Sequence, residues 1–415
     1  MYPTYPRHIV IAADSFKGSN TSTEVGQAMQ RGFQKVFPQT GFRIVPVADG
    51  GEGTVEAVLL AVGGHLERLR VRGPLDSKGS DSKDLDLKDS DSKDPGRGVD
   101  AFWGRLSNGK AVLEMAAASG LPLLAPGQRN PLRTHTYGTG ELIRAALDAG
   151  ARQIMIGIGG SATNDGGVGM AQALGARFLD KDGGELQGGG GSLAELECID
   201  TSGMDPRLKE AEILIACDVS NPLLGERGAS AVYGPQKGAN PEMVAVLDAN
   251  LAHLAAVVTR DLGTSFADEP GAGAAGGLGF GLMSFCGGKL LSGIETVLRI
   301  IDFEKILAAA DLVLTGEGRL DGQSVYGKVP VGVARWAKKA GKPVVAIVGE
   351  LGAEAHAVFD HGIDALFPTV DRAMKSETAI AESRSALEAT AERVARALVV
   401  GLQLGQAGSS GGPQL

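Results

Sequence analysis

Residues 8–37 read HIVIAADSFKGSNTSTEVGQAMQRGFQKVF, and this stretch has the order strand, polar loop, helix. The apolar run from His8 to Ala13 predicts a buried strand, and the amphipathic pattern from about 22 to 37 predicts a helix. Thr21 and Glu24 have the spacing of a capping box, which satisfies free amides at a helix start. Repetition of this order along a chain builds a parallel sheet with helices on both faces.

The same order recurs near both ends of the chain. A second strand is predicted at 42–47 and a helix at about 54–63, while the C-terminal third alternates the strands DLVLT, PVVAIV and IDALFPTV with helices, the last at about 377–402. The middle carries longer, glycine-rich loops around a strand at 153–158. We therefore expect an α/β fold with two domains, in which a second α/β domain, residues 67–289, is inserted into a discontinuous Rossmann-like parallel-sheet domain, residues 1–66 and 290–402.

Two segments are predicted to be flexible. Residues 76–95 read DSKGSDSKDLDLKDSDSKDP, with DSK three times, and offer too few apolar side chains to offset the entropy of ordering. We expect a disordered insertion at 76–98 and a flexible tail at 403–415.

Composition excludes several classes of protein. The 415 residues carry a net charge of -9, so nucleic acid and anionic lipid are not expected partners. Three cysteines support neither a disulfide framework nor a zinc cluster, and the N-terminus has no signal-peptide pattern. No apolar run approaches the roughly 18 residues that a bilayer span needs. We expect a cytoplasmic protein without a membrane partner, either monomeric or homodimeric.

The glycine loop GIGGSATNDGGVGM at 157–170 has two interpretations. Gly157 to Ala162 matches the dinucleotide-binding fingerprint, and Asp180 follows at about the expected distance of 20 residues. This interpretation predicts an NAD-dependent 2-hydroxy-acid dehydrogenase. However, a carboxylate in a pyrophosphate-binding loop is unfavourable, and Asp165 fits better as a metal ligand or as a base toward a hydroxyl. A plain Asx turn is the structural alternative.

Three further loops combine glycine with charged residues after a predicted strand, where open α/β sheets bind ligands. The loop at 14–19, DSFKGS, precedes a helix N-terminus and is typical of an anion site. The loop at 49–54, DGGEGT, has two carboxylates that indicate Mg²⁺. The loop at 315–328 is densely charged. Each loop also has a purely structural interpretation. These are a capped helix start for 14–19, an ordinary turn for 49–54 and an ion-pair network for 315–328.

Weaker signals come from single polar residues. Asp218 follows the apolar run ILIAC, Lys237 lies in the string GPQKG, and Arg133 forms an arginine pair with Arg129 that suits a substrate carboxylate. Together these patterns indicate an enzyme that handles a phosphorylated ligand with a divalent cation.

Nine strings in order resemble the type I glycerate kinase family (glycerate 2-kinase): DSFKGS, ADGGEGT, EMAAASGL, RNPLRTHTYGTGELI, GIGGSATNDGGVGM, ACDVSNPLLG, GPQKG, PGAGAAGGLG and TGEGRLDGQSVYGKVPVGVA. The resemblance runs from about residue 8 to about residue 370, and the insertion at 76–95 departs from it. It implies ATP-dependent phosphorylation of D-glycerate, most readily at the 2-hydroxyl, with ATP and Mg²⁺ bound and transfer in the cleft between the domains. The alternatives are the dehydrogenase and a non-catalytic metabolite-binding protein.

Roles for site residues follow from what phosphoryl transfer requires. Lys17 and Lys328, with Arg319 in reserve, are expected to neutralise phosphate charge. Asp165 is the expected base or hydroxyl-orienting residue, followed by Asp14 and Asp321. The expected Mg²⁺ ligands are Asp49, Glu52 and Glu317. The remaining residues expected to contact substrate or nucleotide are Ser15, Gly50, Gly51, Arg133, Gly159, Gly160, Ser161, Asn164, Asp218 and Lys237.

Overall fold

The computed structural model describes residues 5–16, 18–47, 53–75 and 98–410. The chain divides into two compact units: unit 1 contains residues 1–49 and 297–415, and unit 2 contains residues 50–296. The boundaries expected from the sequence, after 66 and before 290, lie elsewhere because α2 (Thr54–Val62) packs against strands of unit 2. The mixed α/β class agrees with the prediction.

Unit 1 is built on a parallel sheet of five strands, β1 (His8–Ile11), β2 (Gly41–Ile44), β11 (Leu312–Thr315), β13 (Val344–Val348) and β15 (Ala365–Pro368). Their order in the sheet is β15-β13-β11-β1-β2, and Ile9 pairs with both Leu312 and Phe42. Numbered along the chain within this unit, the order is 2-1-3-4-5, the flavodoxin-like form of the doubly wound fold. The direction of winding therefore reverses between β1 and β11.

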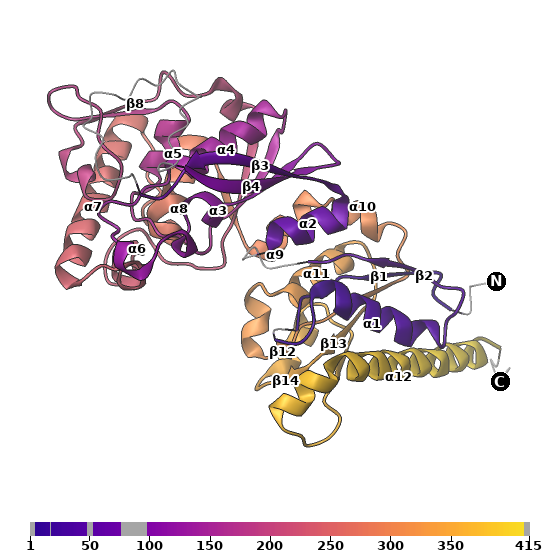
Figure 1. Ribbon diagram of the computed structural model, residues 1–415. Coiled ribbons are helices and arrows are strands. Elements are labelled where there is room, and N and C mark those ends of the chain that lie inside the picture. Colours follow the sequence, from indigo (N-terminus) through magenta and orange to yellow (C-terminus); the bar gives the residue numbers. More distant parts are fainter. Residues whose placement is uncertain (1–4, 17, 48–52, 76–97, 411–415) are drawn as a thin grey trace, which may run out of the picture. The chain divides into compact units, whose positions relative to one another are not determined.

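Helices cover both faces of this sheet (Figure 1). On one face α1 (Ser22–Gln34) and α12 (Ser376–Ser410) pack against each other, and their buried side chains share a core with Ile9 and Ile11. On the other side α11 (Val329–Lys339) packs against β11 and β13, with α10 (Phe303–Leu307) beside it. The boundary between the units falls within α9 (Gly293–Ile300). Smaller elements are the parallel pair β12 (Arg319–Leu320) and β14 (Glu350–Leu351), and the 3₁₀ turns η6 (Gly322–Tyr326) and η7 (Ala355–His361).

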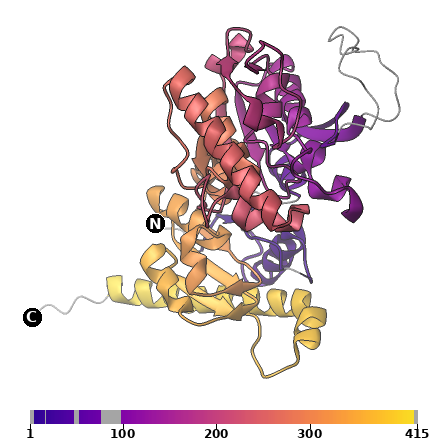
Figure 2. The same ribbon diagram turned by 90° about the vertical axis from the view of Figure 1, so that its left-hand side faces the viewer.

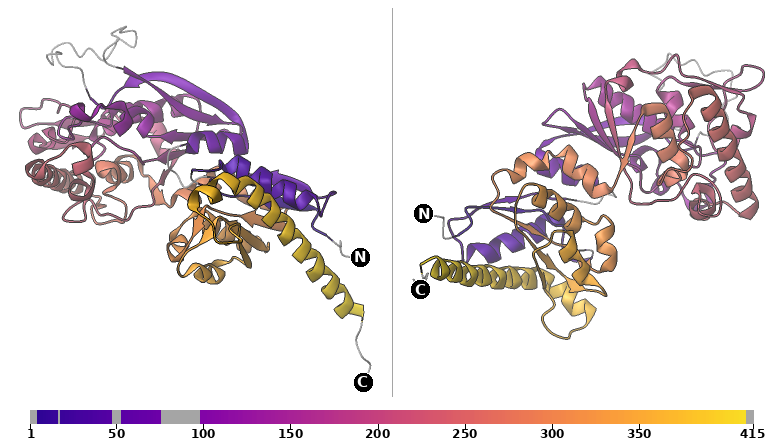
Figure 3. Two further views of the ribbon diagram at one scale, coloured as in Figure 1. Left: turned by 60° about the horizontal axis from the view of Figure 1, so that its bottom comes forward. Right: turned by 180° about the vertical axis from the view of Figure 1, so that it is seen from behind.

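The predicted start of α1 is confirmed, but the predicted end of α12 is not. The capping box is confirmed, since Thr21 accepts a hydrogen bond from the Glu24 amide and Glu24 accepts one from the Thr21 amide at 2.9 Å. By contrast, α12 runs to Ser410 past the expected start of a flexible tail at 403. The sequence has no proline there to stop a helix, and each added residue gains a hydrogen bond. The last turns extend beyond the strands (Figures 2 and 3).

Unit 2 contains a mixed sheet of six strands, β3 (Gly64–Arg72), β4 (Gly98–Leu106), β5 (Ala111–Glu114), β6 (Gln153–Gly157), β9 (Glu212–Ala216) and β10 (Lys289–Leu291). The order is β10-β9-β6-β5-β4-β3; the first four are parallel, and β4 and β3 are antiparallel to their neighbours. A separate antiparallel pair joins β7 (Arg177–Leu179) and β8 (Cys198–Asp200). Of the expected insertion, 76–97 lies outside the described residues, and Gly98 begins β4.

The helices of unit 2 are α2, α3 (Ala116–Ser119), α4 (Tyr137–Asp148), α5 (Val168–Ala173), α6 (Ala229–Tyr233), α7 (Pro241–Leu262) and α8 (Ala274–Cys286). Short 3₁₀ turns are η1 (Leu121–Leu123), η2 (Pro126–Gln128), η3 (Ser192–Glu195), η4 (Pro206–Lys209) and η5 (Pro235–Lys237). By length and composition α7 could cross a membrane. Its residues Leu251 and Val258 are buried in the core of unit 2, as in the core helix of a globular domain.

Close backbone packing explains part of the unusual glycine content. Gly276, in α8, has a φ of +68°, and a Cβ there would lie 1.9 Å from the carbonyl oxygen of Thr163. Glycine is unfavourable inside helices, so this run of glycines gives no sequence signal for α8. Its glycines instead let the helix approach the loop after β6.

Candidate active site

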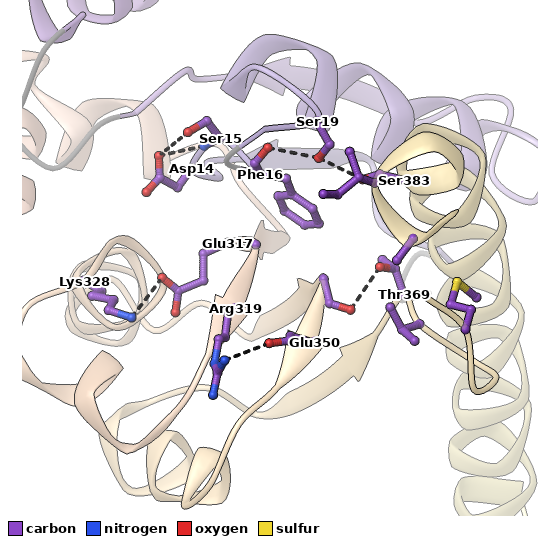
Figure 4. Close-up of a pocket in the computed structure, with 16 residues that line it drawn as sticks. Asp14, Ser15, Phe16, Ser19, Glu317, Arg319, Lys328, Glu350, Thr369 and Ser383 are labelled. Carbon is purple, nitrogen blue, oxygen red and sulfur yellow. Dashed lines mark hydrogen bonds and ion pairs between the residues drawn. The ribbon is translucent and has the colours of Figure 1, made fainter. Parts of the chain in front are cut away.

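A pocket of about 520 Å³ lies in unit 1 beside the point where the winding direction reverses (Figure 4). Its walls come from the chain that follows the carboxyl ends of β1, β11, β13 and β15. Open α/β sheets bind ligands at this position, because loops on the two sides of a reversal point diverge and leave a crevice. Asp14, Ser15, Glu317, Arg319 and Lys328, all predicted from the sequence as site residues, line this pocket.

Glu317 is the most buried charged group in the pocket wall, with 6% of its surface exposed. The Ser324 hydroxyl donates a hydrogen bond of 2.7 Å to Oε1, and Lys328 Nζ lies 4.0 Å from Oε2. Burial raises the pKa of Glu317 to about 7, and the nearby Asp14 and Asp321 act in the same direction. Ser324 and Lys328 oppose this shift. Glu317 therefore exchanges a proton near neutral pH.

Two cations stand at the rim of the pocket. Lys328, immediately before α11, lies 3.8 Å from Asp321 Oδ1, and its side chain is 42% exposed. Arg319 contacts Glu350 at 3.2 Å and Asp321 at 3.7 Å, with 63% of its side chain exposed. Ion pairs this exposed contribute little to stability. Both cations can therefore exchange these partners for an anionic ligand at small cost.

Asp14 lies where β1 ends. Its amide donates to the Gly316 carbonyl at 2.9 Å, joining the ends of β1 and β11, and its Oδ1 accepts a bond of 2.7 Å from the Ser15 amide. The other predicted residues of this region, Lys17, Asp49, Gly50, Gly51 and Glu52, lie outside the described residues. Within the described parts of the chain, no group of three His, Cys, Asp or Glu side chains could hold a metal ion.

The second end of the pocket was predicted only in part, since the loop at 14–19 was expected to bind an anion but its partner in α12 was not expected. It contains Phe16, Ser19 and Ser383, and the Asn20 side-chain amide donates a bond of 2.7 Å to the Ser383 hydroxyl. Thr369 also lines it and donates to the Gly349 carbonyl at 3.2 Å. Ser383 belongs to α12, more than 360 positions along the chain from Ser19. No local pattern could have predicted this pairing.

Asp165, in unit 2, occupies a different environment from the one predicted. Its carboxylate is fully buried, and Oδ2 accepts bonds of 2.8 Å from both the amide and the hydroxyl of Thr136. The amides of Gly167 and Gly169 add bonds of 3.2 and 3.1 Å. The group thus ties the glycine loop to the starts of α4 and α5. With no exposed surface, it does not present a carboxylate to a ligand, which argues for a positioning role rather than that of a base.

Asn164 and Lys237 are also interior residues. The Asn164 amide nitrogen donates to Ser230 at 3.0 Å, and its Oδ1 has no hydrogen-bond partner among the described residues. Lys237 is 1% exposed and donates to the Thr163 carbonyl at 2.7 Å. Burial lowers the pKa of Lys237 to about 7, against an opposing effect of Asp165. Neither residue is in a position to contact a ligand from solvent.

The other predicted residues of unit 2 differ in their exposure. Gly159 and Gly160 are exposed at the end of β6, whereas Ser161 is buried. Arg133 is exposed, and its neighbour Thr134 donates to the Ala162 carbonyl at 2.8 Å, which fixes this segment beside the glycine loop. Asp218, exposed after β9, accepts a bond of 2.9 Å from the Gly293 amide.

The geometry of the glycine loop does not match a dinucleotide site. In that fingerprint the glycines open a helix whose N-terminus holds the pyrophosphate. Here α5 begins only at Val168, six positions after Ala162 closes the match. Gly167 has a φ of +80° and starts the helix instead. The dehydrogenase interpretation therefore loses the observation on which it depended.

Comparison with known proteins covers both units. Residues 9–399 match the sequence model of the glycerate kinase family. The chain belongs to the glycerate kinase family. It is 49% identical to the glycerate kinase of Bacillus subtilis strain 168 over 391 residues, which cover 94% of this chain and 97% of the relative. It is 48% identical to glycerate 2-kinase of Escherichia coli K12 over 396 residues, with coverage of 95% and 99%.

A solved structure agrees with this family assignment. The crystal structure that carries the name glycerate kinase 2, from Salmonella typhimurium LT2, is similar to this chain with a TM-score of 0.80 and 46% sequence identity. The similarity covers 96% of this glycerate kinase family member and all of that chain. The resemblance inferred from the nine sequence strings is thus confirmed.

Proposed function

We propose that this enzyme transfers the γ-phosphoryl group of ATP to the 2-hydroxyl of D-glycerate and forms 2-phosphoglycerate. Membership of the glycerate kinase family establishes the class, a kinase that phosphorylates glycerate. The observation that carries the proposal is the pocket of unit 1, where two exposed cations flank a buried carboxyl group at the reversal point of a parallel sheet. Phosphoryl transfer depends on positioning and charge neutralisation, which such a cluster supplies.

Lys328 and Arg319 are the proposed phosphate-binding cations. Both line the pocket. Among the described residues Arg319 pairs with Asp321 and Glu350, and Lys328 pairs with Asp321 and the buried Glu317. A guanidinium can bind phosphate oxygens in a bidentate way, while an ammonium acts as a point charge. Lys17, from the loop that follows β1, is proposed as a third cation.

The carboxyl groups of the pocket fit Mg²⁺ in their chemistry. Magnesium takes oxygen ligands and is commonly held by one or two carboxylates together with substrate phosphates and water, so a preformed three-residue cluster is not required. Glu317 and Asp14 lie close enough for Asp14 to raise the pKa of Glu317. We propose that Glu317 contributes to the Mg²⁺ site, with Asp49 and Glu52. When bound, Mg²⁺ would neutralise charge on the phosphates.

We assign two further roles to accessible residues: accepting the hydroxyl proton and binding the glycerate carboxylate. Asp14 and Asp321 are partly exposed, and one of them is proposed to accept the hydroxyl proton in place of the buried Asp165. Arg133, with the exposed amides of Gly159 and Gly160, is proposed to bind the glycerate carboxylate. A cytoplasmic location is proposed from the three cysteines, which support no disulfide framework. Small-molecule substrates are proposed because the acidic composition disfavours nucleic acid and anionic lipid as partners.

The position of phosphorylation can be tested with enolase, which accepts 2-phosphoglycerate directly. The enzyme, ATP, Mg²⁺ and D-glycerate are combined with enolase, with and without phosphoglycerate mutase. The expected result is immediate phosphoenolpyruvate formation without the mutase. A signal that appears only when the mutase is added would identify 3-phosphoglycerate and overturn the proposed regiochemistry.

The choice of cofactor is tested by thermal unfolding. A ligand that binds the native state at 100 times its dissociation constant stabilises it by about 2.7 kcal/mol. We expect ATP with Mg²⁺ to raise the melting temperature and NAD to leave it unchanged. Stabilisation by NAD, together with a glycerate-dependent absorbance change of the nicotinamide, would instead support the dehydrogenase.

A further inference from the structure

The pocket of unit 1 has two chemically different ends (Figure 4). Glu317, Lys328 and Arg319 form a charged end beside β12 and α11. Phe16 and Ser383 lie at the opposite end. Ile380, three positions before Ser383 in α12, and Met374 also line the pocket and give it apolar surface. A ligand that fills both ends must itself be charged at one end and apolar, with a few polar atoms, at the other.

The size of the pocket indicates which of the two substrates of a glycerate kinase it binds. Its volume of about 520 Å³ is typical of sites for drug-sized ligands. D-Glycerate has three carbon atoms and no apolar part, so it can use neither the volume nor the apolar wall. A nucleotide has a flat base of low polarity joined through ribose to a chain of phosphates, which matches both ends.

The apolar wall includes a side chain that a ligand could cover. Ile380, in the first turns of α12, is 48% exposed although it faces the pocket, and Ala379 beside it also lines the pocket. Covering such a side chain with an aromatic base would remove apolar surface from water, which favours binding. Phe16, by contrast, is already buried and supports the floor of this end.

The Ser383 hydroxyl adds a directional contact. Its oxygen accepts a bond of 2.7 Å from the Asn20 side chain, and the residue is 7% exposed, so its position is fixed. The Ser19 hydroxyl also donates to this oxygen, at 3.3 Å. The Ser383 hydroxyl can then donate its own proton to a ring nitrogen of a ligand.

We propose that the end of the pocket formed by Phe16, Met374, Ile380 and Ser383 binds the adenine and ribose of the nucleotide, with the phosphates directed toward Lys328 and Arg319. The proposal rests on the proposed kinase function, since it places one of the two substrates of that reaction. It also assigns a function to the N-terminal turns of α12, which the sequence gives no reason to associate with a site. D-Glycerate is then bound by residues outside this end.

The test uses the full-length enzyme and two matched variants. Ile380→Asp puts a charge against the proposed base, and Ala381→Asp puts the same charge on the next residue of α12, which is exposed and does not line the pocket. Dissociation constants are measured by calorimetry with Mg²⁺, separately for ADP and for inorganic pyrophosphate. We expect Ile380→Asp to weaken ADP binding about tenfold, with pyrophosphate binding and the Ala381→Asp variant unchanged.

Three outcomes would overturn the proposal. These are unchanged ADP binding by Ile380→Asp, an equal loss for pyrophosphate and ADP, and a rise in the KM for glycerate with ADP binding unaffected. Glycerate-dependent ADP release by the wild-type enzyme is measured in parallel. If the ADP results are as expected but the wild type releases no ADP, the kinase function fails while the nucleotide site stands. If the wild type turns over normally but Ile380→Asp binds ADP unchanged, the kinase function stands and the proposed adenine site fails.

Discussion

The Lys237 ammonium lies 2.7 Å from the Thr163 main-chain carbonyl oxygen, in an interior position with 1% of the residue exposed. This is its one hydrogen bond within the described part of the chain. Because burial disfavours the charged form, the pKa of Lys237 falls from its ordinary value of 10.5 to about 7, although the nearby Asp165 opposes the shift. The folded state therefore binds this proton less tightly than the unfolded state.

Linkage turns this shift into a prediction about pH. Between about pH 7 and 10.5 the unfolded chain holds a proton that the folded chain has released, so the contribution of Lys237 to stability rises with pH. The free energy of unfolding of the wild type, relative to Lys237→Met, should increase by roughly 2 kcal/mol from pH 7 to pH 9. Urea unfolding of both proteins at several pH values measures it. A constant difference across this range would contradict the lowered pKa.

Asp165→Asn tests whether this carboxylate positions the loop or acts as a base. Thr136 and Gly169 both donate to Oδ2, so an amide nitrogen there would leave at least one donor without an acceptor. We expect the free energy of unfolding to fall by about 2–4 kcal/mol. Denaturant unfolding and kcat are measured on the same samples. A kcat loss of several hundred-fold with stability intact would instead restore the role of base.

Gly159→Ala tests whether a ligand approaches the glycine loop. A Cβ at Gly159 would meet no atom within 4 Å, and its φ lies outside the left-handed region, so neither strain nor crowding explains a glycine there. We expect unchanged or slightly greater stability, by up to about 1 kcal/mol, because alanine reduces the entropy of the unfolded chain. The KM for glycerate should rise severalfold.

The matched control for this variant is Gly127→Ala, at another glycine with open surroundings and an ordinary φ. It should have the same small or absent effect on stability and leave the KM for glycerate unchanged. Equal KM values for Gly159→Ala and the wild type would show that no ligand contacts this part of the loop.

Gly32→Ala tests the contact between α1 and α12. A Cβ at Gly32 would lie 2.3 Å from the Glu388 carbonyl oxygen and 2.6 Å from the Ala391 Cβ. Alanine gains about 1 kcal/mol of helix propensity, but overpacking against backbone costs about 1–3 kcal/mol, so we expect net destabilisation. Gly401→Ala, in α12 with nothing within 4 Å, should gain stability. Thermal unfolding compares them; stabilisation by both changes would show that the helices separate easily.

Local patterns explain what could be predicted from the sequence. The capping box of Thr21 and Glu24 and the strand that begins at His8 depend on residues close in the chain, and both are present as expected. The order of the unit 1 strands could not be predicted, because it depends on which distant segments pair. For the same reason the antiparallel strands β3 and β4 were missed, although each is nine residues long.

The direction of a polar side chain was the least predictable feature of the site. Asp165 and Lys237 lie in glycine-rich loops, which indicates proximity to a ligand, yet the structure buries both. Loop composition does not encode whether a side chain points outward, since amides and hydroxyls from distant loops can satisfy a charge in the interior. Thr136, the main partner of Asp165, is 29 positions away. Ser383 was missed because a serine in a helix carries no signal of its own.

The interior position of β1, between β2 and β11, affects the order in which the chain can fold. β1 pairs with β2 on one side and with β11 on the other, and residues 50–296, which form unit 2, separate these partners in sequence. During synthesis all of unit 2 leaves the ribosome before Leu312–Thr315 is made. The first 49 residues therefore cannot complete their sheet until after unit 2 is available to fold. A chain ended at residue 311 should therefore show a protease-resistant core from unit 2 and a cleavable N-terminal segment. The amino-terminal segment is thus made first and is among the last parts of the molecule to become native.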